Sequence, residues 1–175
     1  MQTIFRLILV IIILILIVSF KPVAREKINW ISLDELQTVY AGNPKPIIID
    51  VYTKHCGWDK VMNKETYSNK KVASYINEHF YAVKFNAESS DSAVLGNKKF
   101  GFNPAYNAND LAVYLLSGRV GYTTTVLLTS PDAQPAPFSG YLKPSELEPP
   151  VKYFGDGVFK NKEFAEYMKE FEGTW

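Results

Sequence analysis

The sequence predicts an α/β protein with a mixed central β-sheet and helices on both of its faces. Residues 47–51 (Ile-Ile-Ile-Asp-Val) are a β-branched run behind two prolines, typical of a strand buried on both faces in mid-sheet. A helical segment and then residues 81–86, which alternate apolar and polar side chains, follow that run. Because a right-handed crossover makes its two strands parallel, this β-α-β unit is expected to be parallel. Residues 123–129 and 138–142 flank a turn and predict an antiparallel pair.

The composition indicates a folded domain without a nucleic-acid-binding surface or an internal disulfide. With 175 residues, 14% of them aromatic, the chain can bury a sizeable core and is not expected to be disordered. Its basic and acidic residues are interspersed and leave a formal net charge of +1, so no nucleic-acid-binding surface is predicted. The chain holds one cysteine, so any disulfide must join it to another molecule.

Residues 1–27 are predicted to be a signal peptide or an N-terminal membrane anchor, and residues 28–175 the folded domain. Residues 4–20 are apolar apart from Arg6 and Ser19, and the unbroken apolar run is residues 7–18. That run suits a signal-peptide core better than a membrane span, which needs about 20 residues. The nearest approach to a cleavage site is Pro22-Val23-Ala24, so an uncleaved anchor stays open.

Helix signals are found along the rest of the chain. Ser32 and Glu35 form a capping box that starts a helix over residues 33–40, with Gly42 beyond its end. Asn109 caps a short helix over residues 110–116. Other helices are expected over residues 57–64, 69–80, 145–154 and 161–171, the one over 145–154 interrupted or delayed by Pro149 and Pro150. Residues 93–102 predict a small hairpin.

Cys56 is placed at the junction between the central strand and the next helix. Backbone N–H groups and the helix dipole favour a thiolate there. The stretch Cys56-Gly57-Trp58-Asp59 matches a Cys-x-x-Cys motif except at its last position, and Asp50 lies six residues before the cysteine.

These residues resemble the thioredoxin superfamily, and in particular the exported bacterial proteins of that superfamily with a Cys-Gly-Trp-Cys motif. Further matches are residues 51–53, 83–88, 111–119, 140–142 and 152–155. The resemblance covers residues 28–171. It implies a thioredoxin-like fold with residues 93–102 as a family-specific insertion and a C-terminal helical extension. It also implies an extracytoplasmic location, the bacterial periplasm, with residues 4–20 as a membrane tether if they are not removed.

The resemblance also shows what this chain lacks. Thioredoxin chemistry needs a second thiol to resolve the mixed disulfide, and the carboxylate of Asp59 has no sulfur to supply. Thr123 takes the place of the family's cis-proline. A cis bond before a non-proline residue costs about 3–4 kcal/mol, so the bond before Thr123 is expected to be trans. Gly57, Trp58, Tyr122 and Thr123 are the expected binding surface.

Three functions stay open on the sequence. The first is a protein that has lost dithiol chemistry and binds or traps polypeptide partners. The second is a thiol-disulfide oxidoreductase that uses Cys56 alone with an external thiol. The third is a membrane-tethered scaffold that ignores Cys56.

Metal and cofactor roles have little support in the sequence. His55, Cys56 and Asp59 are an incomplete ligand set, so neither a metal nor a cofactor is predicted. Asp50 either is an inherited residue without a task, hydrogen-bonded to water, or faces Asp59 and shares a proton with it.

Overall fold

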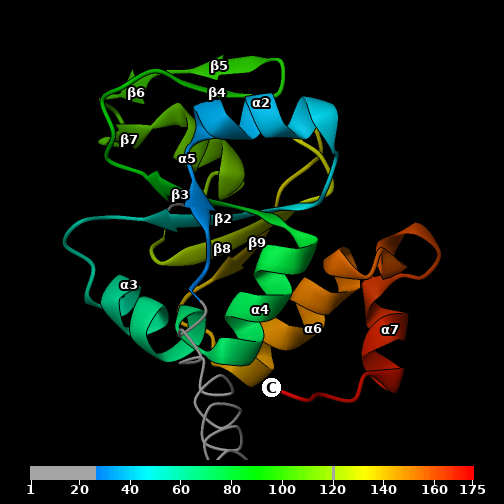
Figure 1. Ribbon diagram of the computed structural model, residues 1–175. Helices are drawn as coiled ribbons and strands as arrows, with labels where there is room; N and C mark the ends of the chain where they lie inside the picture. Colours follow the sequence, from blue (N-terminus) through cyan, green and yellow to red (C-terminus); the bar gives the residue numbers. More distant parts are fainter. Residues whose placement is uncertain (1–26, 120) are drawn as a thin grey trace, which may run out of the picture.

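A computed structural model describes residues 27–119 and 121–175 (Figure 1). The predicted signal peptide or anchor falls almost entirely on residues 1–26, outside the described residues. Within the described part of the chain, no helix combines the length and the apolar character needed to span a bilayer.

The centre of the molecule is a five-stranded mixed sheet with the order β1-β3-β2-β8-β9. β2 lies parallel to β3 and antiparallel to β8, while β1 is parallel to β3 and β9 antiparallel to β8. The predicted mixed sheet and both predicted pairings are confirmed, although the last strand covers residues 136–139 instead of 138–142. The strands are β1 (Trp30–Ile31), β2 (Ile47–Tyr52), β3 (Tyr81–Asn86), β8 (Thr124–Leu128) and β9 (Ala136–Ser139).

Two hydrophobic clusters lie on opposite faces of this sheet, and β2 supplies both because its side chains alternate. Ile47 and Ile49 belong to one cluster, which α2 and α5 cover, and Ile48 belongs to the other, beneath α4 and α6. Figure 1 shows these helix pairs above and below the sheet. Their bounds are α2 (Leu33–Gly42), α5 (Asp110–Leu115), α4 (Lys70–His79) and α6 (Pro144–Gly155).

Helix starts follow the sequence signals closely. The side chain of Ser32 accepts from the backbone N–H of Glu35, whose carboxylate accepts from the N–H of Ser32, so the predicted capping box is present. The side chains of Asn69 and Asn109 accept from backbone N–H groups in the first turns of α4 and α5, as N-caps without a capping box. The helix after Cys56 is α3 (Gly57–Val61), which continues as a π-helix, η1 (Met62–Tyr67).

The prolines in α6 do not interrupt or delay it, contrary to the sequence prediction. The helix begins at Pro144 and runs through Pro149 and Pro150 to Gly155. Leu147 and Val151, on either side of the two prolines, are fully buried. Their packing against the sheet stabilises the helix and outweighs the hydrogen bonds that the prolines cannot donate.

The insertion between β3 and α5 is a pair of short hairpins. β4 (Ala93–Leu95) pairs antiparallel with β5 (Lys98–Phe100) through a turn at Gly96, whose φ of 58° favours glycine. β6 (Phe102–Asn103) pairs antiparallel with β7 (Ala108–Asn109). The predicted hairpin is confirmed, and the second hairpin was not predicted. Both lie on the side of the sheet that carries α2 (Figure 1).

The C-terminal extension comprises a 3-10 turn, η2 (Val158–Lys160), the helix α7 (Phe164–Glu170) and a tail that returns to α6. The carboxylate of Glu148, fully buried in α6, accepts from the backbone N–H groups of Thr174 and Trp175 at 2.7–2.8 Å. Lys152 lies 2.7 Å from the same carboxylate. Burial raises the pKa of Glu148, but the hydrogen bonds from Lys152, Thr174 and Trp175 outweigh it and bring the pKa to about 2.

Candidate functional site

Cys56 lies where β2 gives way to α3, as the sequence predicts. It is the residue before the first helical residue, and its side chain is partly exposed. Its thiol donates toward the backbone oxygen of Tyr122, with Sγ and O 3.5 Å apart. The backbone two residues before β8 therefore lies directly against the thiol.

The bond between Tyr122 and Thr123 is cis, so the expected trans bond was wrong. Contacts on both sides fix the backbone at this position. The oxygen of Tyr122 accepts from Cys56, and the oxygen of Thr123 accepts from the N–H of Gly140 at 2.8 Å. The Thr123 hydroxyl donates to Oδ1 of Asp50 at 3.3 Å. Tertiary contacts thus override the intrinsic preference of a non-proline bond for trans.

Asp50 is buried behind Cys56 and interacts with Lys84. Its side chain is 1% exposed, and its Oδ2 lies 3.0 Å from Nζ of Lys84. This contact is an ion pair without well-directed hydrogen-bond geometry, since Oδ2 accepts no hydrogen bond within the described residues. Burial raises the pKa of Asp50, Lys84 opposes that shift, and the charge of Asp59 adds to it.

Asp59 is also buried, in the position that the resemblance assigns to a second cysteine. Its Oδ2 accepts from the backbone N–H of Thr53 at 3.1 Å, and its Oδ1 has no hydrogen-bond partner in the part of the chain described. The carboxylate therefore ties α3 to the loop that leads into Cys56. Asp50 and Asp59 interact through their charges, and the sharing of a proton between them stays a prediction.

Lys84 is the main member of this site that sequence reasoning missed. Its Nζ also donates to Oδ1 of Asn63 at 2.6 Å and lies 5.1 Å and 5.4 Å from the ring centres of Trp30 and Tyr52. The signal was present in the sequence. Lys84 stands mid-strand in residues 81–86, and a parallel neighbour of residues 47–51 brings it beside Asp50.

Not all of the residues expected to form the binding surface are accessible to a partner. Trp58 is 58% exposed, and its ring stacks on Tyr141 with 6.0 Å between centroids and 20° between planes. Gly57 is exposed, Tyr122 is half-buried and Thr123 is buried. Tyr141 was not predicted as a site residue, although it lies in a stretch that carries the resemblance.

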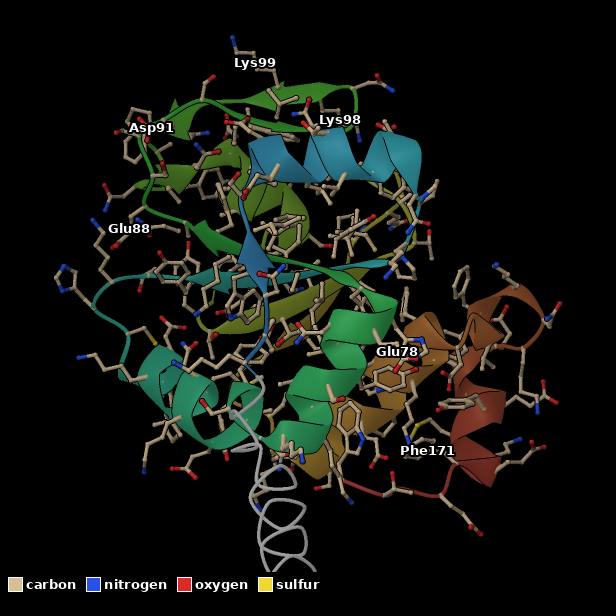
Figure 2. The ribbon with its side chains drawn as sticks, in the orientation of Figure 1. Glu78, Glu88, Asp91, Lys98, Lys99 and Phe171 are labelled. Carbon is tan, nitrogen blue, oxygen red and sulfur yellow. The ribbon has the colours of Figure 1, made fainter. Side chains whose placement is uncertain are left out.

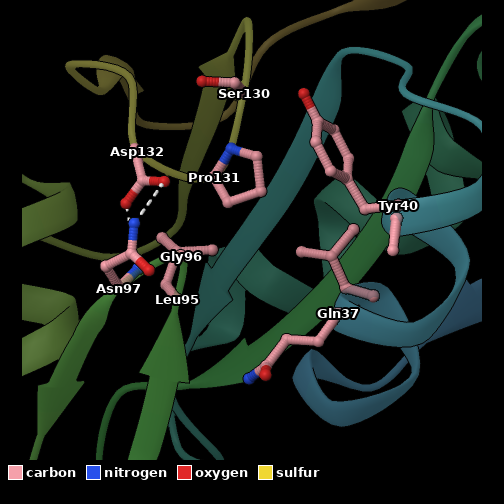
Figure 3. Close-up of a pocket in the computed structure, with 10 residues that line it drawn as sticks. Gln37, Tyr40, Leu95, Gly96, Asn97, Ser130, Pro131 and Asp132 are labelled. Carbon is pink, nitrogen blue, oxygen red and sulfur yellow. Dashed lines mark hydrogen bonds between the residues drawn. The ribbon is translucent and has the colours of Figure 1, made fainter.

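A pocket of about 300 Å³ lies elsewhere, between α2, the β4–β5 hairpin and the turn after β8 (Figure 3). Tyr40, Leu95 and Pro131 form much of its wall. The carboxylate of Asp132 at its edge already accepts from the backbone and side-chain nitrogens of Asn97, at 2.9 and 3.2 Å. None of the residues around Cys56 lines this pocket. Across residues 27–119 and 121–175, no three His, Cys, Asp or Glu side chains are grouped as metal ligands would be.

Comparison with known families gives a match over most of the chain. Residues 20–154 match the model of the Thioredox_DsbH family, described as protein of unknown function, DUF255. The chain is also similar to an uncharacterised protein of Caenorhabditis elegans, with 31% identity over 104 residues. That stretch is 59% of this chain and 12% of the nematode protein, so the chain spans only a small part of this relative.

Solved structures support the fold. A thioredoxin-fold protein from Helicobacter pylori superposes with a TM-score of 0.54 at 19% identity, over 73% of this chain and 80% of that one. A DsbH oxidoreductase gives 0.53 at 14% identity, over 82% and 92%. A thioredoxin from Thermus thermophilus gives 0.55 at 14% identity, over 84% and 99%. The chain therefore has a thioredoxin-like fold.

Proposed function

Because the chain belongs to the Thioredox_DsbH family, we propose that it binds or covalently traps polypeptide partners and has lost dithiol redox chemistry. The observation that carries this proposal is the buried carboxylate of Asp59. The resemblance to Cys-Gly-Trp-Cys proteins assigns this position to the second thiol, and here its carboxylate accepts a hydrogen bond from the backbone N–H of Thr53. Cys56 is the only thiol of the chain.

A single thiol supports only half of a reduction cycle. The Cys56 thiolate attacks one sulfur of a partner disulfide, a new S–S bond forms to Cys56, and the other partner sulfur leaves as a thiolate. Release of the bound partner requires a second thiolate to attack the mixed disulfide. Since the chain has no other cysteine, that thiolate must come from another molecule, and without one the partner stays attached.

The surroundings of Cys56 favour a polypeptide as the partner. The backbone at Tyr122, against the thiol and two residues before β8, can pair with an extended segment. The exposed ring of Trp58, stacked on Tyr141, offers apolar surface next to it. An extended chain placed here would have main-chain hydrogen bonds and one aromatic contact.

The alternative is a single-cysteine thiol-disulfide oxidoreductase. The partial exposure of Cys56 and its place before the first turn of α3 support this activity. The enzyme would use the same first step and would then be released by an external thiol, such as glutathione. The two functions differ in turnover, not in the bond that Cys56 forms.

We further propose that the domain acts outside the cytoplasm, in the bacterial periplasm. The apolar residues 4–20 and the resemblance to exported thioredoxin-like proteins support this location. Residues 4–20 would tether the domain to the inner membrane if they are not removed.

The test is a disulfide-reduction assay with insulin as substrate. With a recycling dithiol reductant, the wild-type chain is expected to give no rate above that of the reductant alone. In the absence of reductant, it is expected to form a covalent adduct with a disulfide-bonded polypeptide that Cys56→Ser does not form. Repeated release of reduced product without an external monothiol would contradict the proposal. Turnover that appears only with added glutathione, and is lost in Cys56→Ser, would favour the alternative.

A further inference from the structure

The topology of the sheet sets the order of the groups around Cys56. β2 and β3 are parallel, so the residues after them, Cys56 and Glu88, lie at the same end of the sheet. β8 is antiparallel to β2 and β9 is antiparallel to β8, so Tyr122 and Tyr141 reach that end too. The strand order β3-β2-β8-β9 therefore places Glu88 on one side of Cys56 and Tyr122, and Tyr141 on the other.

Glu88 is held close to the thiol loop. The turn after β3 is fixed by Asn86, whose side-chain oxygen accepts from the N–H of Glu88 at 3.2 Å. The carboxylate of Glu88 accepts from the backbone N–H of Lys54, two residues before Cys56, at 3.4 Å. It also adds to the rise in the pKa of Tyr122, whose main cause is burial. Glu88 therefore lies close to two groups next to Cys56, the backbone of Lys54 and the side chain of Tyr122.

The charge of Glu88 is available to a partner. The side chain is exposed and forms no ion pair within residues 27–119 and 121–175. Asp91, in the same connection, is exposed too, and Figure 2 shows both on the side of the molecule where the loop between β2 and α3 lies. The exposed Lys54 and His55 in that loop form no ion pair with either of them.

The opposite side of Cys56 is aromatic. Trp58 and Tyr141 are stacked there, and the Trp58 ring is more than half exposed. A segment that crosses Cys56 and Tyr122 thus meets a negative charge on one side and an aromatic surface on the other.

We propose that the preferred partner of Cys56 is an extended polypeptide whose cysteine has a basic residue on one side and an aromatic residue on the other. Glu88 selects the basic residue, and the Trp58–Tyr141 pair receives the aromatic one. This inference rests on the proposed function, because it assumes that Cys56 forms a bond with a polypeptide cysteine. It adds Glu88 as a specificity-determining residue.

The test measures mixed-disulfide formation with synthetic peptides that carry one cysteine as its pyridyl disulfide. The Cys56 thiolate attacks the peptide sulfur and pyridine-2-thiolate leaves, so the reaction is followed by pyridinethione absorbance. Two peptides have tryptophan two residues from the cysteine on one side, and either lysine or glutamate two residues away on the other. Both peptides are also made in reversed order. The ratio of the lysine to the glutamate rate cancels any change in the reactivity of Cys56 itself.

In at least one peptide order, the wild-type chain is expected to react about three- to tenfold faster with the lysine peptide at low salt. The ratio should approach one near 1 M salt, where charges are screened within about 3 Å. Glu88→Gln is expected to lower the ratio by about threefold or more. Glu78→Gln is the matched control, since Glu78 is an exposed glutamate on α4 that lies well apart from Glu88 in Figure 2, and it should leave the ratio unchanged.

Two results would overturn the inference in different ways. Equal rates for the two peptides in both orders, or the same ratio in wild type and Glu88→Gln, would remove Glu88 from specificity while the proposed function stands. No thione release above that of Cys56→Ser with any peptide would overturn the proposed function and this inference with it.

Discussion

Lys84 reaches Asp50 from the neighbouring strand, with Nζ 3.0 Å from Oδ2, because the two residues are register partners in the parallel pair of β2 and β3. The ion pair lies directly behind the Cys56 loop. Burial nevertheless keeps the pKa of Asp50 above its ordinary value. The folded protein therefore binds a proton at Asp50 more tightly than the unfolded chain does. The free energy of unfolding depends on pH for this reason.

Because it removes this carboxyl group, Asp50→Asn is expected to raise the free energy of unfolding measurably at pH 7. In the wild type the folded state keeps the Asp50 proton to higher pH than the unfolded chain does, so stability falls as the pH rises from 3.8 through the raised pKa. The gain from the substitution should therefore shrink as the pH is lowered toward 3.8. Urea unfolding at several pH values measures it. The exposed Asp34→Asn is the control, and an equal pH dependence there would argue against Asp50 as the source.

Lys84→Met is expected to destabilise the protein by about 3 kcal/mol at pH 7, since it leaves the Asp50 charge buried without its partner. The same substitution in an Asp50→Asn background should cost much less. A double-mutant cycle from urea unfolding gives the coupling. Additive costs would mean that Lys84 stabilises the fold through Asn63 and the Trp30 and Tyr52 rings instead.

Glu148→Gln is expected to cost about 2–4 kcal/mol at pH 7, because it removes the charge that Lys152, Thr174 and Trp175 bind. The lowered pKa, about 2 against 4.5, means that this stability is present above pH 4.5 and is lost as the pH falls through about 2. Wild type and variant should thus converge in acid. Thermal unfolding across that range tests it, with the exposed Glu172→Gln as control. A difference that persists at pH 2 would point to packing instead of charge.

Asp59→Cys is expected to give a disulfide with Cys56 and measurable reduction of insulin, because it supplies the missing sulfur where the fold would use it. Mass spectrometry after mild oxidation should show the loss of two hydrogens. Asp59→Ser removes the same carboxylate from Thr53 without adding a thiol, and should show neither effect. If the disulfide forms but no reduction follows, the second thiol is not the element that the chain lacks.

Trp58→Ala is expected to weaken the capture of a tryptophan-containing peptide by about tenfold or more while leaving the unfolding free energy nearly unchanged, since 58% of Trp58 is exposed. The rate of adduct formation at Cys56 reports it. Tyr106→Ala, on the connection between β6 and β7, removes an aromatic side chain that is 52% exposed and serves as the control. An equal loss in both variants would mean that the effect is not specific to the Trp58–Tyr141 pair.

The sequence predicted best where local chemistry decides the structure. The β-branched run at residues 47–51, the Ser32–Glu35 box and the Asn109 cap each depend on neighbouring residues alone, and each is confirmed. The predicted position of Cys56 between the central strand and the next helix is confirmed too.

Prediction from the sequence was wrong where tertiary contacts outweigh a local conformational preference. The bond before Thr123 is cis among contacts from Cys56, Asp50 and Gly140. The prolines of α6 lie within a helix that buried leucine and valine side chains stabilise. The roles of Lys84 and Tyr141 needed the strand register and the ring geometry, which no pattern of single residues supplies.

The contact between Glu148 and the C-terminal tail also determines where the folded domain ends. The family match ends at residue 154. The carboxylate of Glu148, inside the matched region, nevertheless accepts hydrogen bonds from the backbone N–H groups of Thr174 and Trp175, outside it. A shortened protein that stopped after Gly155 would expose the α6 surface and leave this acid with only Lys152. The tail therefore belongs to the folded unit, although the family match stops before it.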